Sequence, residues 1–217
     1  MRTRRIFGWG AMLAGLAAGL TACGSDDKAG PYGNYDFDLA VSASVTCMEN
    51  HWTGTLRDNG FTPADSVTVL SWKVGVGEPE AKDELTIDGT NPSVTLDAAA
   101  VGVACDSADT MLIFMPRAGG TFGDVEDAGS RGAVQGGGYN GLSGTFEWGI
   151  QTDSTVAVKS VEVHLYNLGT GKAGATFDLA EGATGTWTGT SSGLADGVMA
   201  GIVAKDAGGK VVGVMAL

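Results

Sequence analysis

DLAVSASVTCM, residues 38–48, alternates small apolar side chains with serine and threonine. Successive side chains of a strand point to opposite faces, so a period of two predicts a β-strand with one buried face. The apolar positions are Val41, Ala43, Val45 and Cys47. This stretch therefore favours a protein built from sheets.

Similar runs recur on both sides of it. They lie at 66–76, 84–87, 93–96 and 110–115, and again at 145–150, 155–168, 175–179, 185–190, 197–206 and 210–217. Turn-forming pairs such as Asp88-Gly89 and Asn91-Pro92 separate them. After the N-terminal segment, no window longer than ten residues has helical periodicity. The sequence predicts an all-β protein made of β-sandwiches.

The segment 117–144 is rich in glycine and lacks a clear period. A structureless connection of this length is unusual inside one compact domain, so a domain boundary is expected here. We predict a β-sandwich domain at 35–116, a Gly-rich linker or long loop at 117–144, and an immunoglobulin-like β-sandwich at 145–217. A mobile linker would expose Arg117 and Arg131 to trypsin. The alternative is a single sandwich in which the segment is a packed loop.

The N-terminus has the pattern of an export signal. Arg2, Arg4 and Arg5 precede the uncharged run 6–20, whose fifteen residues are too few for a membrane span of about 20. We therefore predict a signal peptide at 1–22. The polar stretch that follows, 23–34, contains glycine and proline and is predicted to be a tether.

The residues at the end of this signal, Leu20-Thr21-Ala22-Cys23, resemble the lipobox of bacterial lipoproteins. The resemblance implies that Cys23 carries diacylglycerol, that cleavage occurs just before it, and that its new amine receives a fatty acid such as palmitate. Two or three chains make a stable membrane anchor. Gly24 and Ser25 stand where a retention aspartate would hold such a protein at the inner membrane, which favours the outer membrane of a Gram-negative bacterium. The alternative is an ordinary secretory signal.

The composition limits the partners. Without residues 1–22 the chain keeps 10 basic and 25 acidic residues, a formal charge of −15. Nucleic acid and anionic headgroups would be repelled, so neither is an expected partner. Cys47 and Cys105 remain after Cys23 is lipidated, and a pair of cysteines in an exported chain predicts a disulfide.

The C-terminal stretch 185–212 resembles the last strands of bacterial immunoglobulin-like domains, which implies that fold. The matching residues, in order, are Trp187-Thr188, Leu194, Asp196-Gly197, Ala204, Asp206 and Gly209. Val198 replaces the usual tyrosine and Lys210 the usual asparagine. In the N-terminal part, Cys47, Trp72 and Cys105 follow the order of immunoglobulin domains, although Trp72 is too far beyond Cys47. The tetrapeptide WTGT, at 52–55 and 187–190, hints at a repeat.

No catalytic residues are predicted, and the protein is interpreted as a non-enzymatic spacer or protein-binding module. The GTSSG stretch, 189–193, fits a nucleophile-elbow pattern but lacks the helix that the motif requires. No cofactor or metal site is predicted. Weak calcium binding by the acidic groupings is the alternative, and these lie at 78–84, 106–109 and 124–127.

The alternative function is carbohydrate binding at the cell surface. Trp148, Tyr139, Tyr166 and Trp187 could form an aromatic platform for sugar rings. His164 and Tyr166 alternate with Val163 and Leu165, so they are predicted to face outward and are the candidate ligand-facing residues. The expected partner is an unknown envelope protein or glycan.

Overall fold

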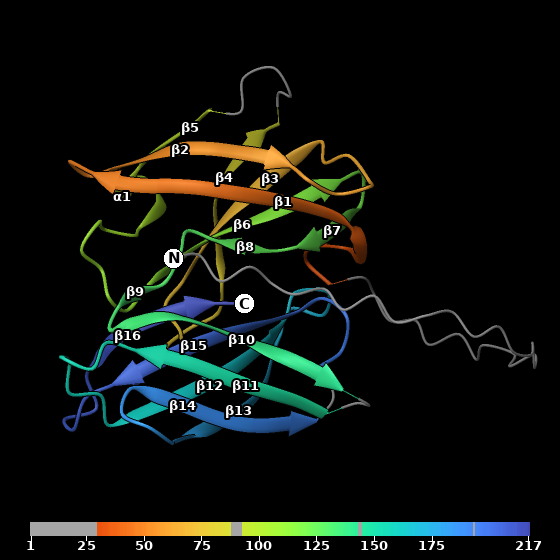
Figure 1. Ribbon diagram of the computed structural model, residues 1–217. Helices are drawn as coiled ribbons and strands as arrows, with labels where there is room; N and C mark the ends of the chain where they lie inside the picture. The colour runs from red at the N-terminus through yellow and green to blue at the C-terminus, as the bar shows by residue number, and fades with distance from the viewer. Residues whose placement is uncertain (1–29, 88–92, 143–144, 193) are drawn as a thin grey trace, which may run out of the picture.

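The computed structural model describes residues 30–87, 93–142, 145–192 and 194–217 (Figure 1). Its first strands are β1 (Asn34–Met48), β2 (His51–Asp58), β3 (Ser66–Trp72), β4 (Glu80–Thr86), β5 (Ser93–Asp97), β6 (Met111–Ala118), β7 (Thr121–Asp124) and β8 (Glu126–Asp127). The rest are β9 (Arg131–Gly132), β10 (Val134–Leu142), β11 (Thr145–Thr152), β12 (Ser160–Asn167), β13 (Lys172–Glu181), β14 (Thr186–Ser192), β15 (Val198–Lys205) and β16 (Val211–Ala216). Over these residues the only helix is α1 (Ala98–Val101), so the all-β prediction is confirmed.

The strand order is that of two immunoglobulin-like sandwiches. In the first half, β1, β2 and β5 form one layer, while β4, β3, β6 and β7 form the other. In the second half, β10, β11 and β14 form one layer, while β13, β12, β15 and β16 form the other. In both, the first, second and fifth strands share a layer and the third, sixth and seventh share the opposite one, as in immunoglobulin domains. The predicted tandem sandwiches are confirmed.

One strand in each half joins its two layers. In the first half, residues 34–40 of β1 pair in parallel with β7, and residues 41–48 pair antiparallel with β2. In the second half, β13 pairs with β12 through most of its length and with β14 near its end. Each sandwich is therefore a continuous sheet folded over its own core.

The prediction that 117–144 is a linker or loop is wrong. This segment contains the end of β6 and strands β7 to β10, and the chain passes from the first sheet to the second between Asp127 and Arg131. Side chains of β11 cover two of the glycines of the edge strand β10. A Cβ atom on Gly137 would lie 2.5 Å from Ile150 Cδ1, and one on Gly141 would lie 2.9 Å from the Phe146 ring. Cross-strand side chains of this kind stabilise glycine in an edge strand.

The WTGT repeat has no structural counterpart. Trp52 lies in β2, the second strand of the first sandwich, whereas Trp187 lies in β14, the fifth strand of the second. The tryptophan on the strand equivalent to β2 is Trp148 of β11. The two tetrapeptides therefore do not mark equivalent positions.

A hydrophobic core lies between the two sandwiches, in addition to the core inside each one. It is formed by the layer of β3 and β6 on one side and the layer of β12, β15 and β16 on the other (Figure 1). The first half supplies Leu70, Trp72, Val74, Met111, Ile113, Met115, Phe122 and Val125, and the second half supplies Tyr166, Leu168, Met199, Val203, Val214 and Ala216. The four layers therefore enclose three successive cores.

Trp72 is central to this shared core. Its side chain is 3% exposed, and its ring centroid lies 6.0 Å from that of Tyr166 on the strand equivalent to its own. Its indole nitrogen donates to the carbonyl of Gly77, 2.9 Å away. An aromatic pair buried in this way fixes how the two sandwiches pack, because it adds directional contacts to the burial of apolar area.

A glycine in β15 allows the two halves to approach. A Cβ atom on Gly201 would lie 2.8 Å from the Trp72 ring and 2.8 Å from Val74 Cγ2. We expect Gly201→Ala to lower the free energy of unfolding by about 1–3 kcal/mol, because it overpacks the shared core. The matched control is Gly149→Ala in β11, where an added Cβ meets nothing within 4 Å. Urea unfolding of both variants measures the difference, and equal stabilities would contradict the close approach.

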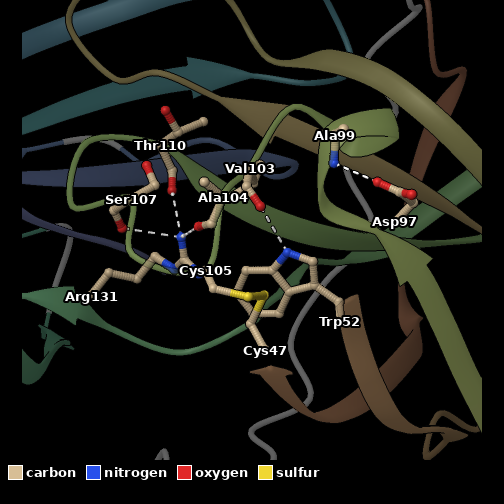
Figure 2. Close-up of a disulfide and its surroundings, with 10 residues drawn as sticks. All are labelled: Cys47, Trp52, Asp97, Ala99, Val103, Ala104, Cys105, Ser107, Thr110 and Arg131. Atoms are coloured by element: carbon tan, nitrogen blue, oxygen red, sulfur yellow. Dashed lines mark hydrogen bonds between the residues drawn. A yellow bond between two sulfur atoms is a disulfide. The ribbon is translucent and has the colours of Figure 1, made fainter. Parts of the chain in front are cut away.

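The predicted disulfide between Cys47 and Cys105 is confirmed (Figure 2). It joins the end of β1 to the loop between α1 and β6, whereas the disulfide of immunoglobulin domains joins their two sheets. Trp72 lies in the shared core, and Trp52 takes the place beside the bridge, with its indole nitrogen 2.9 Å from the carbonyl of Val103. The immunoglobulin order of Cys47, Trp72 and Cys105 is therefore coincidental.

Arg131 of β9 attaches the second half to the disulfide loop (Figure 2). Its guanidinium donates to the carbonyls of Ala104 and Ser107 at 3.1 Å, and it lies 4.3 Å from the centroid of the Trp52 ring. Since β9 pairs with β16, this side chain links the two sheets. Arg131 therefore belongs to a packed junction, contrary to the prediction of a mobile segment around it.

Candidate functional site

A cavity of about 210 Å³ opens at the junction of the two sandwiches. Strands from both halves contribute to it, together with the turn that precedes β15. Its aromatic and acidic lining consists of Tyr35, Phe122, Asp124, Tyr139, Phe146 and Asp196. We call this the junction cleft. Clefts between domains are common places for binding sites.

The aromatic side chains form two pairs. The Tyr35 and Phe122 ring centroids lie 5.7 Å apart, and those of Tyr139 and Phe146 lie 5.5 Å apart, both in edge-to-face geometry. Tyr139 also contacts Trp148, at 5.0 Å between centroids. Tyr139 remains 45% exposed, so these contacts orient a ring that is still accessible to a ligand.

The acidic side chains lie beside these rings. The Tyr35 hydroxyl donates to Asp124 Oδ1 at 2.5 Å. Burial raises the pKa of Tyr35, and the hydrogen bond to Asp124 and the charge of Asp196 raise it further. Tyr35 therefore stays protonated at neutral pH, and its hydroxyl remains a donor to Asp124.

A glycine, Gly197, lines the junction cleft at a position where a side chain would not fit. Gly197 has φ 71°, in the left-handed region, and a Cβ atom there would lie 2.9 Å from the Phe122 ring. It belongs to the Asp196-Gly197 pair on which the immunoglobulin-like resemblance rests. Both the turn conformation and the close packing of Phe122 and Tyr35 therefore require glycine at this point of the cleft lining.

The prediction that His164 and Tyr166 face outward fails for Tyr166, which is 4% exposed within the shared core. Both side chains lie on the same face of β12, as the alternation predicted, but the first sandwich covers that face. His164 approaches the turn after β3, since a Cβ on Gly75 would lie 3.3 Å from its imidazole. Neither side chain lines the junction cleft.

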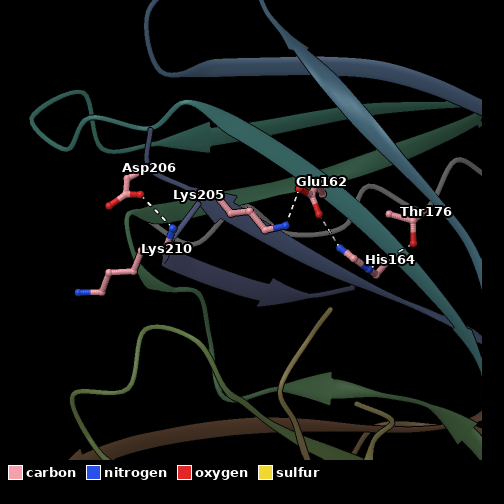
Figure 3. Close-up of polar contacts among 6 residues, drawn as sticks. All are labelled: Glu162, His164, Thr176, Lys205, Asp206 and Lys210. Atoms are coloured by element: carbon pink, nitrogen blue, oxygen red, sulfur yellow. Dashed lines mark hydrogen bonds and ion pairs between the residues drawn. The ribbon is translucent and has the colours of Figure 1, made fainter. Parts of the chain in front are cut away.

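His164 belongs to a polar cluster at this interface (Figure 3). Its Nε2 lies 2.9 Å from Glu162, and the other oxygen of Glu162 accepts from Lys205 at 2.6 Å. Burial raises the pKa of Glu162, but the hydrogen bonds from Lys205 and His164 outweigh it and hold that pKa below its ordinary value. The cluster satisfies the polar groups at this contact and so has a structural role.

Only one residue of the predicted aromatic platform is accessible. Trp148, Tyr166 and Trp187 are 2–4% exposed, whereas Tyr139 borders the junction cleft. Sequence reasoning missed Tyr35, Phe146, Asp124 and Asp196 as its neighbours in the cleft. The sequence around Tyr139 did contain one indication of an accessible ring, because the neighbouring glycines have no side chains to cover it.

The other predicted sites have less support in the structure. Cys23 and its lipobox lie outside the described residues. Across those residues, no group of three or more His, Cys, Asp or Glu side chains could hold a metal ion. None of the described helices is long and apolar enough to cross a membrane.

In GTSSG, Ser191 lies in β14 and its hydroxyl accepts from the Trp148 indole at 2.9 Å, so the stretch forms no nucleophile elbow.

No protein-family model matches the chain, and no curated protein matches it. Among solved structures, it is similar to the FN1–FN3 domains of chicken CNTN1, at 8% identity and a TM-score of 0.30 over 87% of this chain, which spans 65% of that chain. It is also similar to Escherichia coli alpha-2-macroglobulin, domains NIE–MG1, at 10% identity and a TM-score of 0.33 over 84% of this chain and 98% of that one. It is also similar to a tetra-tandem repeat in the extending region of a large adhesion protein, at 16% identity and a TM-score of 0.29. That match covers 82% of this chain and 49% of the other chain. None of these assigns a function, and the immunoglobulin-like class rests on the strand order.

Proposed function

We propose that the protein is a non-enzymatic, lipid-anchored protein of the bacterial cell envelope whose two sandwiches form one rigid protein-binding module. The observation that carries the proposal is the shared core, which turns two small domains into a single body with a cleft at their junction. Interfaces between domains in one chain are usually more polar and permit relative motion, whereas a large apolar interface prevents it. A rigid body suits both a spacer and a binding surface.

The course of the chain near its N-terminus supports anchoring at the junction. Gly30 packs against the backbone of Gly169 in the second half, and Gly33 packs against that of Gly120 in the first. Tyr35 then enters the junction cleft. The seven Cα–Cα steps from Cys23 to Gly30 can span at most about 25 Å, so a lipid on Cys23 would keep the cleft near the membrane.

Lipid attachment is tested at Cys23. We expect Cys23→Ser to abolish incorporation of a clickable fatty acid and to leave an unprocessed precursor, because the acceptor thiol is lost. Labelling of cells that express either form measures this, and a Ser25→Ala variant is the matched control. Label retained by the Cys23→Ser protein would contradict the proposed anchoring.

The binding role is tested by cross-linking in intact cells, followed by identification of the attached protein. Protease shaving in the same cells shows whether the module faces outward from the outer membrane. A protein that is cross-linked through residues around the junction cleft supports the proposal. Cross-links spread evenly over the surface would contradict it.

Carbohydrate binding is the alternative function, and the accessible ring of Tyr139 is the observation that favours it. Sugar rings stack on exposed aromatic side chains, but they also need donors and acceptors around their hydroxyl groups. A glycan screen with residues 24–217 separates the two functions. Glycan binding that is lost in Tyr139→Ala would establish the alternative.

A further inference from the structure

We propose that the junction cleft binds an alkylammonium group, such as a lysine side chain or a quaternary amine. This deepens the proposed binding function by naming the chemistry that the site recognises, and it rests on that function. The argument uses the charges of the lining residues, the geometry of the rings and the size of the cavity.

The charges favour a cation. Asp124 and Asp196 lie among the residues that line the cavity, and no Lys, Arg or His lies among them. Within the described residues, neither aspartate forms a salt bridge. The acidic chain as a whole adds to the attraction, because its surface potential concentrates cations near the cleft.

The rings favour an organic cation over a metal ion. An ammonium group within about 6 Å of an aromatic ring is attracted by the negative face of that ring, and choline and methylated lysine are recognised in aromatic cages. Tyr35, Tyr139 and Phe146 line the junction cleft together with the two aspartates, and the Tyr35 hydroxyl donates directly to Asp124. Each ring is held by an edge-to-face neighbour, so little ordering is needed on binding.

The volume of the cavity favours one small chemical group over a whole drug-sized ligand. Sites for drug-sized ligands measure roughly 300–1,000 Å³, whereas this cavity is about 210 Å³. The Tyr35 hydroxyl already donates to Asp124, which leaves the lining side chains with more acceptors than donors. A sugar needs both, but an ammonium group needs acceptors and ring faces alone.

The experiment is an NMR titration of residues 24–217 with choline and with 3,3-dimethyl-1-butanol, which has the same shape without the charge. Nα-acetyl-lysine methylamide and glucose are titrated in parallel. We expect choline or the lysine derivative to bind at least five to ten times more tightly than the neutral alcohol, with shifts at Tyr139 and Gly197. Asp196→Asn and Tyr139→Leu should each weaken binding about fivefold. Asp178→Asn, at an exposed position of β13 outside the cleft, should leave it unchanged.

Each outcome has a definite meaning. Binding of the lysine derivative alone supports a protein segment as the natural ligand, and binding of choline alone supports a small quaternary amine. Equal binding of choline and the alcohol, stronger binding of glucose, or shifts away from the junction cleft would overturn the proposal. If these titrations fail while cross-linking still captures an envelope protein, the binding-module function stands and the ammonium site does not. Far-UV circular dichroism confirms that each variant is folded.

Discussion

Replacing Trp72 with alanine is expected to lower the free energy of unfolding by about 3–5 kcal/mol and to destabilise both sandwiches together. The side chain is buried in the shared core and contacts Tyr166 and the backbone at Gly201, so its removal leaves a large cavity between the two halves. Urea unfolding, followed by tryptophan fluorescence and far-UV circular dichroism, measures the loss.

Native-state hydrogen exchange locates this effect. Amides of the second half, such as those of Ile202 and Val203 in β15, should lose protection by the same free energy as amides of β3. The control is Trp187→Ala, which leaves a cavity in the internal core of the second sandwich. If the two sandwiches unfold as one unit, it should also lower the protection of amides in both halves by one common free energy. Unchanged protection of β15 in Trp72→Ala would show that the sandwiches unfold independently.

Removing the disulfide is expected to lower the free energy of unfolding by about 4 kcal/mol. The bridge closes a loop with a sequence separation of 58, and the chain-entropy model gives this value for a loop of that length. The double variant Cys47→Ser/Cys105→Ser is compared with the parent by urea unfolding. The Cys105 loop also supplies the carbonyls that accept from Arg131, so the double variant should weaken attachment of the second half as well.

The matched control for this result is Arg131→Lys, which keeps a positive charge but cannot reproduce the bonds of a guanidinium to several carbonyls. Arg131→Lys should lower the free energy of unfolding by less than the double cysteine variant does. Mass spectrometry of non-reduced peptides establishes the bridge in the exported protein. Two free thiols in folded protein, or equal stability of the double variant and the parent, would contradict the assignment.

The sequence predicted the strands whose two faces differ. The alternation in 38–48 marks β1, which has one face on the internal core of the first sandwich. β6 has a different signal, because its residues 111–115, MLIFM, form a continuous apolar run. Such a run is typical of a strand buried on both faces, and Ile113 packs in the shared core while Phe114 packs in the internal one. This run was the available evidence for a third core.

Other features depend on partners that are distant in sequence. Alternation placed His164 and Tyr166 on one face of a strand, but it could not show that another sandwich covers that face. The glycines of β10 are a different case, because the side chains that pack on Gly137 and Gly141 come from the next strand of the same hairpin, and the glycine content hid that strand. The junction cleft combines residues from 35 to 217, so no local pattern could predict it.

The most direct test of the shared core is a calorimetric scan of residues 24–217. If the two sandwiches form one cooperative body, a single transition should appear, with a calorimetric enthalpy equal to the van't Hoff enthalpy. Two transitions, or a calorimetric enthalpy about twice the van't Hoff value, would show two independent domains and would contradict this account.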